Sequence, residues 1–282
     1  MWQRIKTAIV LIAIVGFALF ASTLPIFVLP LLAAGVLIAA HEWTKLMPKW
    51  REPAQFIVVV LIVTMASIFV PMTWAIWWAL SLVIWVMATG WVLQYPAKEK
   101  WYGKRLVYMG GVILTAAITA MYGLWQMSPW WLMYVFLLVW CADSGAYFVG
   151  RKFGKRKLAP NVSPNKSIEG LVGGVATAGV VAWLVGDYLQ LSGTALAWFL
   201  LLSAITVMAS VLGDLFESML KRRAGIKDSG TILPGHGGVL DRIDSLLSAT
   251  PVFALGFLIL LEMGVFTEVW IKLHLANLSQ IL

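Results

Sequence analysis

The feature that most constrains this chain is the presence of three long segments without a charged side chain, at residues 7–40, 53–97 and 106–142. A helix needs about 20 apolar residues to cross the roughly 30 Å hydrocarbon core of a bilayer, so each segment is too long for one crossing. Each is interrupted near its middle by residues typical of turns, at Ser22–Pro25, Val70–Pro71 and Ser128–Pro129. Each segment therefore predicts two membrane helices joined by a tight turn.

Three further apolar segments, at residues 169–187, 193–213 and 246–265, are each long enough for one crossing. Only 12% of the residues are charged and 61% are hydrophobic, whereas about a quarter of the residues in a soluble domain are charged. The sequence therefore predicts an all-α, polytopic integral membrane protein with about nine transmembrane helices, and it excludes a soluble globular domain. The last segment, 266–282, is expected to be a short amphipathic or interfacial tail.

Basic side chains fall on one side of this arrangement. Twenty of the 21 Lys and Arg residues lie in the N-terminal segment or in alternate connections, and Lys272 is the exception. Because Lys and Arg accumulate in cytoplasmic loops, we expect the N-terminus and the large loops to be cytoplasmic and the C-terminus to lie outside. An alternative is that the first segment is a cleaved signal peptide. Cleavage would leave eight crossings, and the Lys and Arg residues would still lie on the same side of the membrane.

Polar residues concentrate between Asp143 and Asp244. We therefore expect membrane-anchoring helices over residues 1–125 and a catalytic membrane half over residues 126–265, with cytoplasmic loops at 150–168 and 214–245. A single cysteine, Cys141, excludes an intrachain disulfide and a multi-cysteine zinc site. The net charge of +8 on so apolar a chain favours anionic lipid or an anionic substrate over nucleic acid as the partner.

Carboxylates stand at the ends of the last two predicted crossings. Asp214, Glu217 and Ser218 follow one crossing, and Asp241 and Asp244 precede the next. Helical spacing of three or four residues places each set on one face. A carboxylate in the bilayer requires a partner, and Mg²⁺ prefers a few carboxylates with water and substrate phosphates. Asp214, Asp241 and Asp244 are therefore the predicted metal ligands, and the alternative for Asp244 is a salt bridge to Arg222 or Arg242.

A glycine-rich turn lies between these two sets, at residues 234–238. Glycines let backbone N–H groups approach a bound phosphate, although no Gly-Lys-Ser/Thr follows as in a Walker A loop. His236 within the turn is either a turn residue or a functional residue, as a base or a ligand. Asp228 is either a ligand or the solvated partner of Lys227.

A second polar segment precedes the crossing at residues 169–187. Ser163, Asn165, Lys166 and Ser167 lead directly into the predicted helix, whose N-terminus offers unpaired N–H groups to an anion. This pattern favours phosphate binding. Asp143 and Tyr147 are four residues apart on the preceding helix, and Asp143 is either a ligand or the counter-ion of Lys166.

The run Ser218-x-Leu220-Lys221-Arg222-x4-Lys227-Asp228-x-Gly230-x2-Leu233-Pro234-x-His236-Gly237-Gly238-Val239-x-Asp241-Arg242-Ile243-Asp244 resembles the motif of the phosphatidate cytidylyltransferase (CDP-diacylglycerol synthase) family. Residues 143–150 and 163–170, and Glu42-Trp43, also resemble that family. The resemblance extends over residues 1–265 and is strongest from 140 to 245. It implies a homodimeric, Mg²⁺-dependent nucleotidyltransferase that joins CTP to phosphatidate, giving CDP-diacylglycerol and pyrophosphate for phospholipid biosynthesis. It also implies a metal centre on Asp214 and Asp241, with the number of ions left open.

Both substrates are polyanions, so basic side chains and a metal must neutralise them before they can meet. We expect catalytic roles for one set of residues, Asp214, Asp241, Lys221, Arg222, Asp228 and His236. We expect substrate binding by a second set, Asp143, Tyr147, Ser163, Asn165, Lys166, Ser167, Gly237, Gly238 and Arg242. The expected location is a bacterial inner membrane, with the active site facing the cytoplasm and no nucleic acid as partner. The alternatives are a CTP-dependent kinase of a membrane polyprenol and an ion-coupled transporter.

Overall fold

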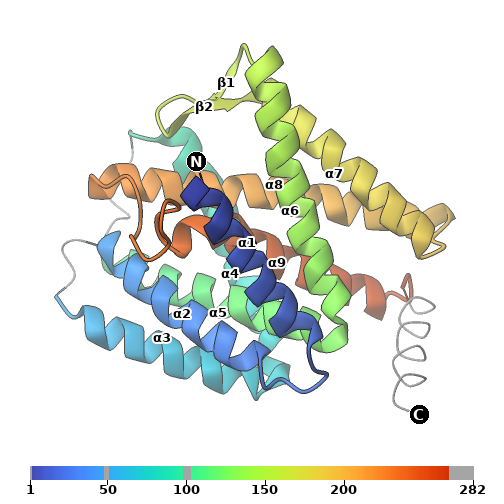
Figure 1. Ribbon diagram of the computed structural model, residues 1–282, viewed down its shortest axis with the longest axis horizontal. Coiled ribbons are helices and arrows are strands. Elements are labelled where there is room, and N and C mark those ends of the chain that lie inside the picture. Colours follow the sequence, from blue (N-terminus) through green and yellow to red (C-terminus); the bar gives the residue numbers. More distant parts are fainter. Residues whose placement is uncertain (1, 48–50, 98–102, 267–282) are drawn as a thin grey trace.

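The computed structural model describes residues 2–47, 51–97 and 103–266. Within these ranges the chain forms nine α-helices, one short 3₁₀ helix and one two-stranded hairpin (Figure 1). The elements are α1 (Trp2–Phe20), α2 (Val28–Lys45), α3 (Pro53–Ile68), η1 (Pro71–Thr73), α4 (Trp74–Gln94), α5 (Lys104–Met127), α6 (Pro129–Phe153), β1 (Lys157–Ala159), β2 (Ser163–Ser167), α7 (Ile168–Tyr188), α8 (Gly193–Ala224) and α9 (Leu240–Glu262).

The three predicted interruptions are confirmed as helix boundaries. The first separates α1 from α2, and the second is the 3₁₀ helix that begins at Pro71 and precedes α4. At the third, the Ser128 side chain accepts a hydrogen bond from Trp130 N at 3.4 Å and so caps α6, with Pro129 in its first turn. Proline is favoured there because the first helical N–H groups have no partner within the helix.

Six helices of the described ranges are long and apolar enough to cross a membrane: α4 together with η1, α5, α6, α7, α8 and α9. Two shorter apolar helices occupy Ile9–Phe20 and Pro53–Ile68. An all-α, polytopic membrane protein is confirmed, whereas nine crossings and the orientation of the N-terminus stay predictions. Apart from Phe266, the predicted tail at 266–282 lies outside the described residues.

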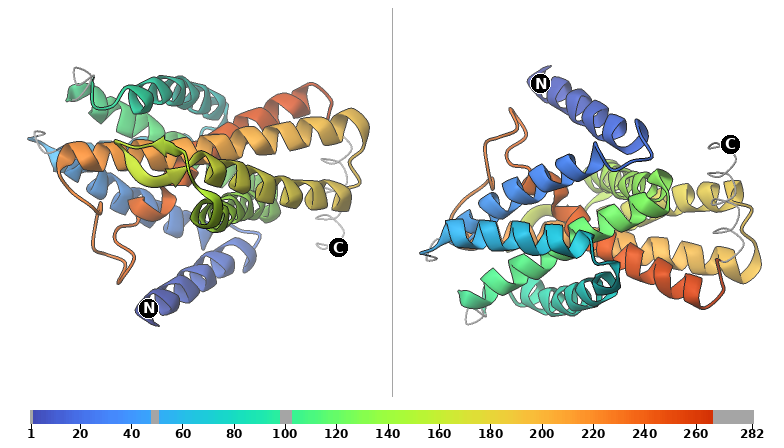
Figure 2. Two further views of the ribbon diagram at one scale, coloured as in Figure 1. Left: turned by 90° about the horizontal axis from the view of Figure 1, so that it is seen from above. Right: turned by 90° about the horizontal axis from the view of Figure 1, so that it is seen from below.

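The α5 helix occupies the centre of the fold, and its side chains are buried from Ile113 to Trp125. Small residues on it, including Ala116, Ala117 and Ala120, allow other helices to approach closely. By contrast, α1 leaves the other helices at an angle (Figure 2) and exposes Ile9, Ile12 and Phe17. Such side chains are suited to lipid.

Two connections differ from their predicted bounds. The α8 helix continues past residue 213 to Ala224 because Phe216, Met219 and Leu220 are buried, and it ends at Gly225, whose φ of 70° is left-handed. The loop before α9 therefore covers only residues 225–239. Similarly, α6 extends to Phe153, and the antiparallel β1–β2 hairpin that follows was not predicted.

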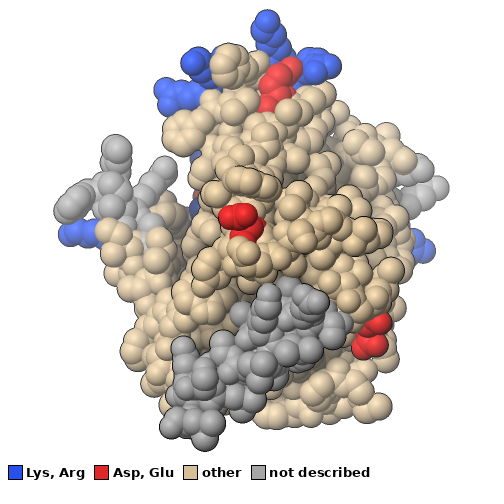
Figure 3. Space-filling model, turned by 90° about the vertical axis from the view of Figure 1, so that its right-hand side faces the viewer, with Lys and Arg blue, Asp and Glu red and all other residues tan. Residues whose placement is uncertain are grey.

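Charged residues gather at one end of the molecule. The hairpin and the 225–239 loop lie towards the top and left of Figure 1, and the α7–α8 turn lies at the right. On the face shown in Figure 3, most Lys and Arg side chains lie at the top, above a broad surface with few charges. This distribution is that of a membrane protein with one strongly charged end.

Candidate functional site

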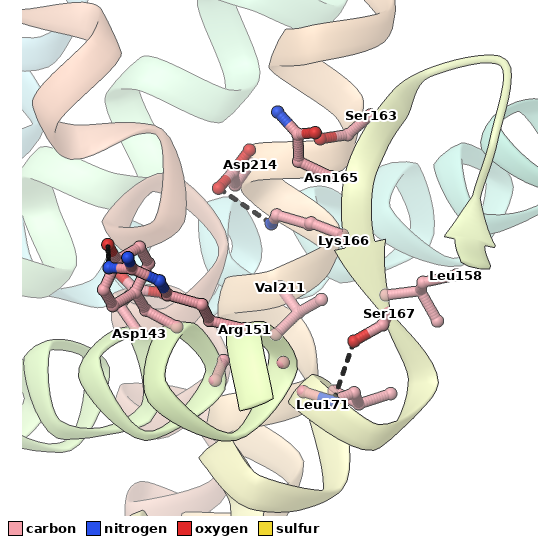
Figure 4. Close-up of a pocket in the computed structure, with 14 residues that line it drawn as sticks. Asp143, Arg151, Leu158, Ser163, Asn165, Lys166, Ser167, Leu171, Val211 and Asp214 are labelled. Carbon is pink, nitrogen blue, oxygen red and sulfur yellow. Dashed lines mark hydrogen bonds and ion pairs between the residues drawn. The ribbon is translucent and has the colours of Figure 1, made fainter. Parts of the chain in front are cut away.

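A cavity of about 560 Å³ opens at the charged end, between α6, β2, α7 and α8. Its walls combine acidic, basic, hydroxyl and apolar side chains (Figure 4). The residues that line it are Asp143, Ala146, Tyr147, Gly150, Arg151, Leu158, Ser163, Asn165, Lys166, Ser167, Gly170, Leu171, Val211 and Asp214. The cavity thus brings together six of the nine predicted substrate-binding residues and Asp214.

An ion pair spans this cavity. Lys166 in β2 and Asp214 in α8 point toward each other, with Nζ and Oδ2 2.8 Å apart (Figure 4). About a quarter of each side chain is exposed, 26% and 30% respectively, so both remain accessible to a ligand. Asp143 lies within electrostatic range of both residues, which leaves the predicted choice between ligand and counter-ion open.

The N-terminus of α7 also lines the cavity. Ser167 Oγ accepts a hydrogen bond from Gly170 N at 3.1 Å and caps the helix. Ser163 and Asn165 lie in the strand that leads to this cap (Figure 4). A helix N-terminus beside a lysine is a suitable environment for a phosphate.

One charged residue of the cavity lining was missed by sequence reasoning. Arg151, which falls in the cytoplasmic loop expected at residues 150–168, lines the cavity and donates a hydrogen bond to Tyr147 Oη at 3.0 Å. Its position four residues after Tyr147 places both on one face of α6. That spacing was the available signal, and it adds a second cation to the cavity wall.

A second cluster lies between α8 and α9. Lys221 forms ion pairs with Glu217 and with Asp241. The three side chains are nearly inaccessible, at 15%, 3% and 4% exposure for Lys221, Glu217 and Asp241. Buried charges of this kind need close partners, and Lys221 is the shared one.

The carboxylate of Asp241 is surrounded by donors. Lys221 Nζ lies 2.7 Å from Oδ1, Ser229 N donates to Oδ2 at 3.0 Å, and Gly238 N donates to Oδ2 at 2.8 Å. Asp241 therefore fastens both ends of the 225–239 loop to the first turn of α9. Because both of its carboxylate oxygens accept these hydrogen bonds, Asp241 is less available to a metal ion than Asp214 is.

Asp244 connects the two groups of charges. It lies within electrostatic range of Asp214 and of Glu217, and its Oδ1 accepts a hydrogen bond from Ser245 N at 2.7 Å. Within the described ranges it forms no salt bridge with Arg222 or Arg242. The ionisable groups of α6, α8 and α9 thus form a continuous series from the cavity to the loop.

The carboxylates near the cavity fit a hydrated metal better than a closed protein site. No group of three or more His, Cys, Asp or Glu side chains in the described part of the chain is close enough to hold a metal. Mg²⁺, however, usually takes one or two carboxylates and completes its shell with water and substrate phosphates. Asp214, with Asp244 within electrostatic range of it, matches that requirement.

The glycine-rich turn folds onto itself. Leu233 N donates to Gly237 O at 2.9 Å, and His236 N donates to Leu233 O at 2.9 Å. Gly235 and Gly237 have φ values of 76° and 82°, which favour glycine. Since Gly238 N is bound to Asp241, this N–H group is engaged in closing the loop.

The other predicted site residues do not line the cavity. Arg222 Nε donates to Val162 O at 3.5 Å, and Asp228 and Arg242 are exposed. His236 is partly buried, and its Nδ1 has no hydrogen-bond partner within the described residues. The residues that lie outside the cavity lining are Lys221, Arg222, Asp228, His236, Gly237, Gly238, Asp241, Arg242 and Asp244.

Glu42 of α2 is a further residue absent from the predicted site. It is completely buried and accepts hydrogen bonds from Leu240 N at 2.7 Å and Val239 N at 3.2 Å. A glutamate at the end of an otherwise apolar helix was a sequence signal for a functional role. Its partners were hidden because they lie nearly 200 residues further along the chain.

The chain is similar to known proteins over most of its length. A model of the cytidylyltransferase family matches residues 2–260. A phosphatidate cytidylyltransferase of Haemophilus influenzae is 38% identical over 89% of this chain and 96% of its own length. The enzyme of the same name from Pseudomonas aeruginosa is 44% identical over 89% of this chain and 95% of its own length. The chain therefore belongs to the cytidylyltransferase family.

Proposed function

We propose that this protein is a phosphatidate cytidylyltransferase, which transfers CMP from CTP to phosphatidate and releases pyrophosphate. The names of the two relatives that match almost their whole length support the reaction. The observation that carries the proposal within the molecule is the Lys166–Asp214 ion pair in a cavity at the charged end of a membrane bundle. A lipid phosphate can reach that end from the bilayer surface.

The chemistry is a displacement at phosphorus. A phosphate oxygen of phosphatidate forms a bond to the α-phosphorus of CTP, the bond from that phosphorus to the bridging oxygen breaks, and pyrophosphate leaves with the electron pair. Such transfers depend on positioning and charge stabilisation more than on covalent help from the protein. Lys166, Arg151 and the N-terminus of α7 supply positive charge to the phosphates.

We further propose Mg²⁺ as the cofactor, held by Asp214 with Asp244, and leave open a second ion. The metal would neutralise phosphate charge and stabilise the departing pyrophosphate. The approach of the Lys166 ammonium to Asp214 agrees with a site that attracts cations. Asp241, predicted as a ligand, supports the same region by binding Lys221 and the loop.

The setting of the enzyme is also proposed. Nine crossings with a cytoplasmic N-terminus place the cavity and the 225–239 loop on the cytoplasmic side, as the distribution of Lys and Arg favours. Membrane lipids surround the helices, and a homodimer is the expected assembly. The bacterial relatives support the plasma membrane as the location.

Product analysis tests the reaction. Purified protein is incubated with phosphatidate and with CTP labelled in cytidine or, separately, in the γ-phosphate, with and without EDTA. The proposal predicts a lipid product that carries the cytidine label, requires the divalent ion and excludes the γ label. A lipid that carries only the γ label indicates a CTP-dependent kinase and would overturn the proposal.

A further inference from the structure

The buried carboxylate of Glu42 joins the two halves of the protein. Glu42 lies near the end of α2, in the half expected to serve only as an anchor, and its side chain has 0% exposure. Leu240 N, Val239 N and Ser229 Oγ donate to it at 2.7, 3.2 and 3.3 Å. One side chain of α2 therefore holds both the beginning of α9 and the loop that precedes it.

The contacts complete an otherwise uncapped helix. The first N–H groups of a helix have no partner within the helix, and a polar side chain usually supplies one. Val239 occupies the position of that residue in α9 and makes no side-chain cap. Glu42 supplies the missing acceptor from α2, and its negative charge is favourable at the positive end of the helix dipole.

The local sequence is adapted to this carboxylate. A Cβ atom on Gly230 would meet Glu42 Oε1, and one on Gly238 would meet Ser229 Oγ and the Glu42 carboxylate. Neither glycine has a positive φ, so space rather than backbone conformation requires glycine at both positions. The loop closes around Glu42 with no room for a larger residue.

Glu42 is itself held in place by its neighbour. Trp43 is almost completely buried and donates a hydrogen bond from Nε1 to Leu106 O of α5 at 3.2 Å. Gly110 of α5 lies directly against the Trp43 ring, where a Cβ would collide with it. The carboxylate is thus presented from a rigid contact between α2 and the central helix.

On the opposite side of the loop, Asp241 binds Gly238 N and Ser229 N. Ser229 and the start of α9 are therefore held between two carboxylates, one from α9 and one from α2. Asp244 lies one turn after Asp241 on the same helix. A Cβ atom on Gly213, the residue before Asp214, would meet the backbone oxygen of Asp244, and the Asp244 side chain lies within electrostatic range of Asp214. The position of the first turn of α9 determines where Asp244 stands relative to the cavity.

We propose that Glu42 is a positioning residue for catalysis, which fixes the first turn of α9 and so places Asp244 beside Asp214. The effect of Glu42 on catalysis rests on the proposed cytidylyl transfer. Its role in fixing the loop and the first turn of α9 does not depend on that function. Without the carboxylate, the loop and the first turn of α9 populate other arrangements, and only the fraction in the competent arrangement turns over. The substrate sites at Lys166 and the α7 N-terminus are left intact.

The test uses Glu42→Gln, which keeps the volume of the side chain. The NH₂ group of the new amide can only donate, so it faces an N–H or O–H group that the carboxylate oxygen had accepted from. Ser229→Ala removes one of the three hydrogen bonds and is the milder variant. Glu262→Gln, at the exposed far end of α9, is the matched control. For each protein, kcat and KM for CTP, the melting temperature in detergent and hydrogen–deuterium exchange along the chain are measured.

The expected result for Glu42→Gln is a fall in kcat of about tenfold or more, as for the loss of hydrogen bonds to a charged group. KM for CTP stays within about twofold, and exchange accelerates in residues 225–242 but not in α6 or α7. Ser229→Ala changes the same quantities less, and Glu262→Gln changes none. Uniformly faster exchange in all helices, or wild-type kcat with wild-type exchange in the loop, would overturn the proposal. If wild-type protein shows no transfer of CMP, the proposed function fails, and exchange in the loop alone decides the role of Glu42.

Discussion

Lys166 in β2 and Asp214 in α8 form an ion pair of 2.8 Å across a cavity at the charged end of the helix bundle. The two residues come from the two polar segments of the sequence, and only the fold brings them together. A polyanionic substrate that enters the cavity competes with Asp214 for the lysine, and a cation competes with the lysine for Asp214. In the proposed function, this pair is the place where substrate phosphate and metal would meet.

Replacement of Lys166 by Met should impair use of the nucleotide. A charge-assisted contact between lysine and phosphate is lost, and we expect kcat/KM for CTP to fall by about a hundredfold. Steady-state kinetics in detergent micelles with saturating phosphatidate measure the change. Lys152→Met is the control because Lys152 lies on the same helix end as Arg151 but outside the cavity lining. Equal kinetics for both variants would contradict a phosphate-binding role.

Removal of Lys221 should destabilise the protein. Lys221→Met leaves Glu217 and Asp241 buried without their shared cation, and breaking a buried pair in this way costs about 3–5 kcal/mol. We expect the melting temperature to fall by roughly 10 °C. Thermal unfolding in detergent, monitored by tryptophan fluorescence, measures this change. Adding Glu217→Gln to Lys221→Met should recover part of the loss, since one carboxylate becomes neutral. If Lys221→Met alone is as stable as wild type, the ion pairs of Lys221 are not needed for stability.

Gly238→Ala should disturb the 225–239 loop because of where its methyl group lies. The same change at a position with free space should have no such effect. The new Cβ would meet Ser229 Oγ and the Glu42 carboxylate, so we expect a large loss of turnover. Gly35→Ala on α2 is the control, because a Cβ there meets nothing within 4 Å and alanine favours the helix by roughly 0.5–1 kcal/mol. Turnover and thermal unfolding are measured for both. Full activity of Gly238→Ala would contradict the tight closure of the loop around Glu42.

The orientation in the membrane can be measured with single cysteines. In a Cys141→Ser background, Lys227→Cys in the loop after α8 should react with a membrane-impermeant maleimide only after spheroplasts are lysed. Ser192→Cys in the exposed α7–α8 connection should react in intact spheroplasts, because consecutive loops of a polytopic protein lie on opposite sides. The reverse pattern would place the cavity outside and contradict the cytoplasmic assignment.

The sequence predicted the helices well because hydrocarbon imposes a simple requirement. Charge-free length and the positions of Pro71 and Pro129 were enough to divide the long segments. The end of α8 was placed too early because the charged residues after Asp214 resemble a loop. Their apolar neighbours, such as Phe216 and Leu220, are buried against other helices, which a single sequence does not reveal.

The candidate site was predictable only in part. Helical spacing correctly placed Asp214 with Ser218, whose Oγ donates to Asp214 Oδ1 at 3.2 Å. The partners of Glu42 lie up to 198 residues away in the sequence. Those of Asp241 are only 3 to 20 residues away, but their contacts depend on how the 225–239 loop folds back onto α9. The β1–β2 hairpin, which carries Lys166 to the cavity, is too short and polar to give a periodic signal.

The most direct test of the account is the rate at which Asp214→Asn forms CDP-diacylglycerol from CTP labelled in the α-phosphate and phosphatidate, in the presence of Mg²⁺. Asp187→Asn, at the exposed far end of α7, serves as the control, and melting temperatures verify that both variants fold. We expect Asp214→Asn to lose at least about a hundredfold in rate, comparable to the loss of a group that stabilises transition-state charge, and Asp187→Asn to match wild type. A folded Asp214→Asn protein with a rate within twofold of wild type would contradict the assignment of this cavity as the site of transfer.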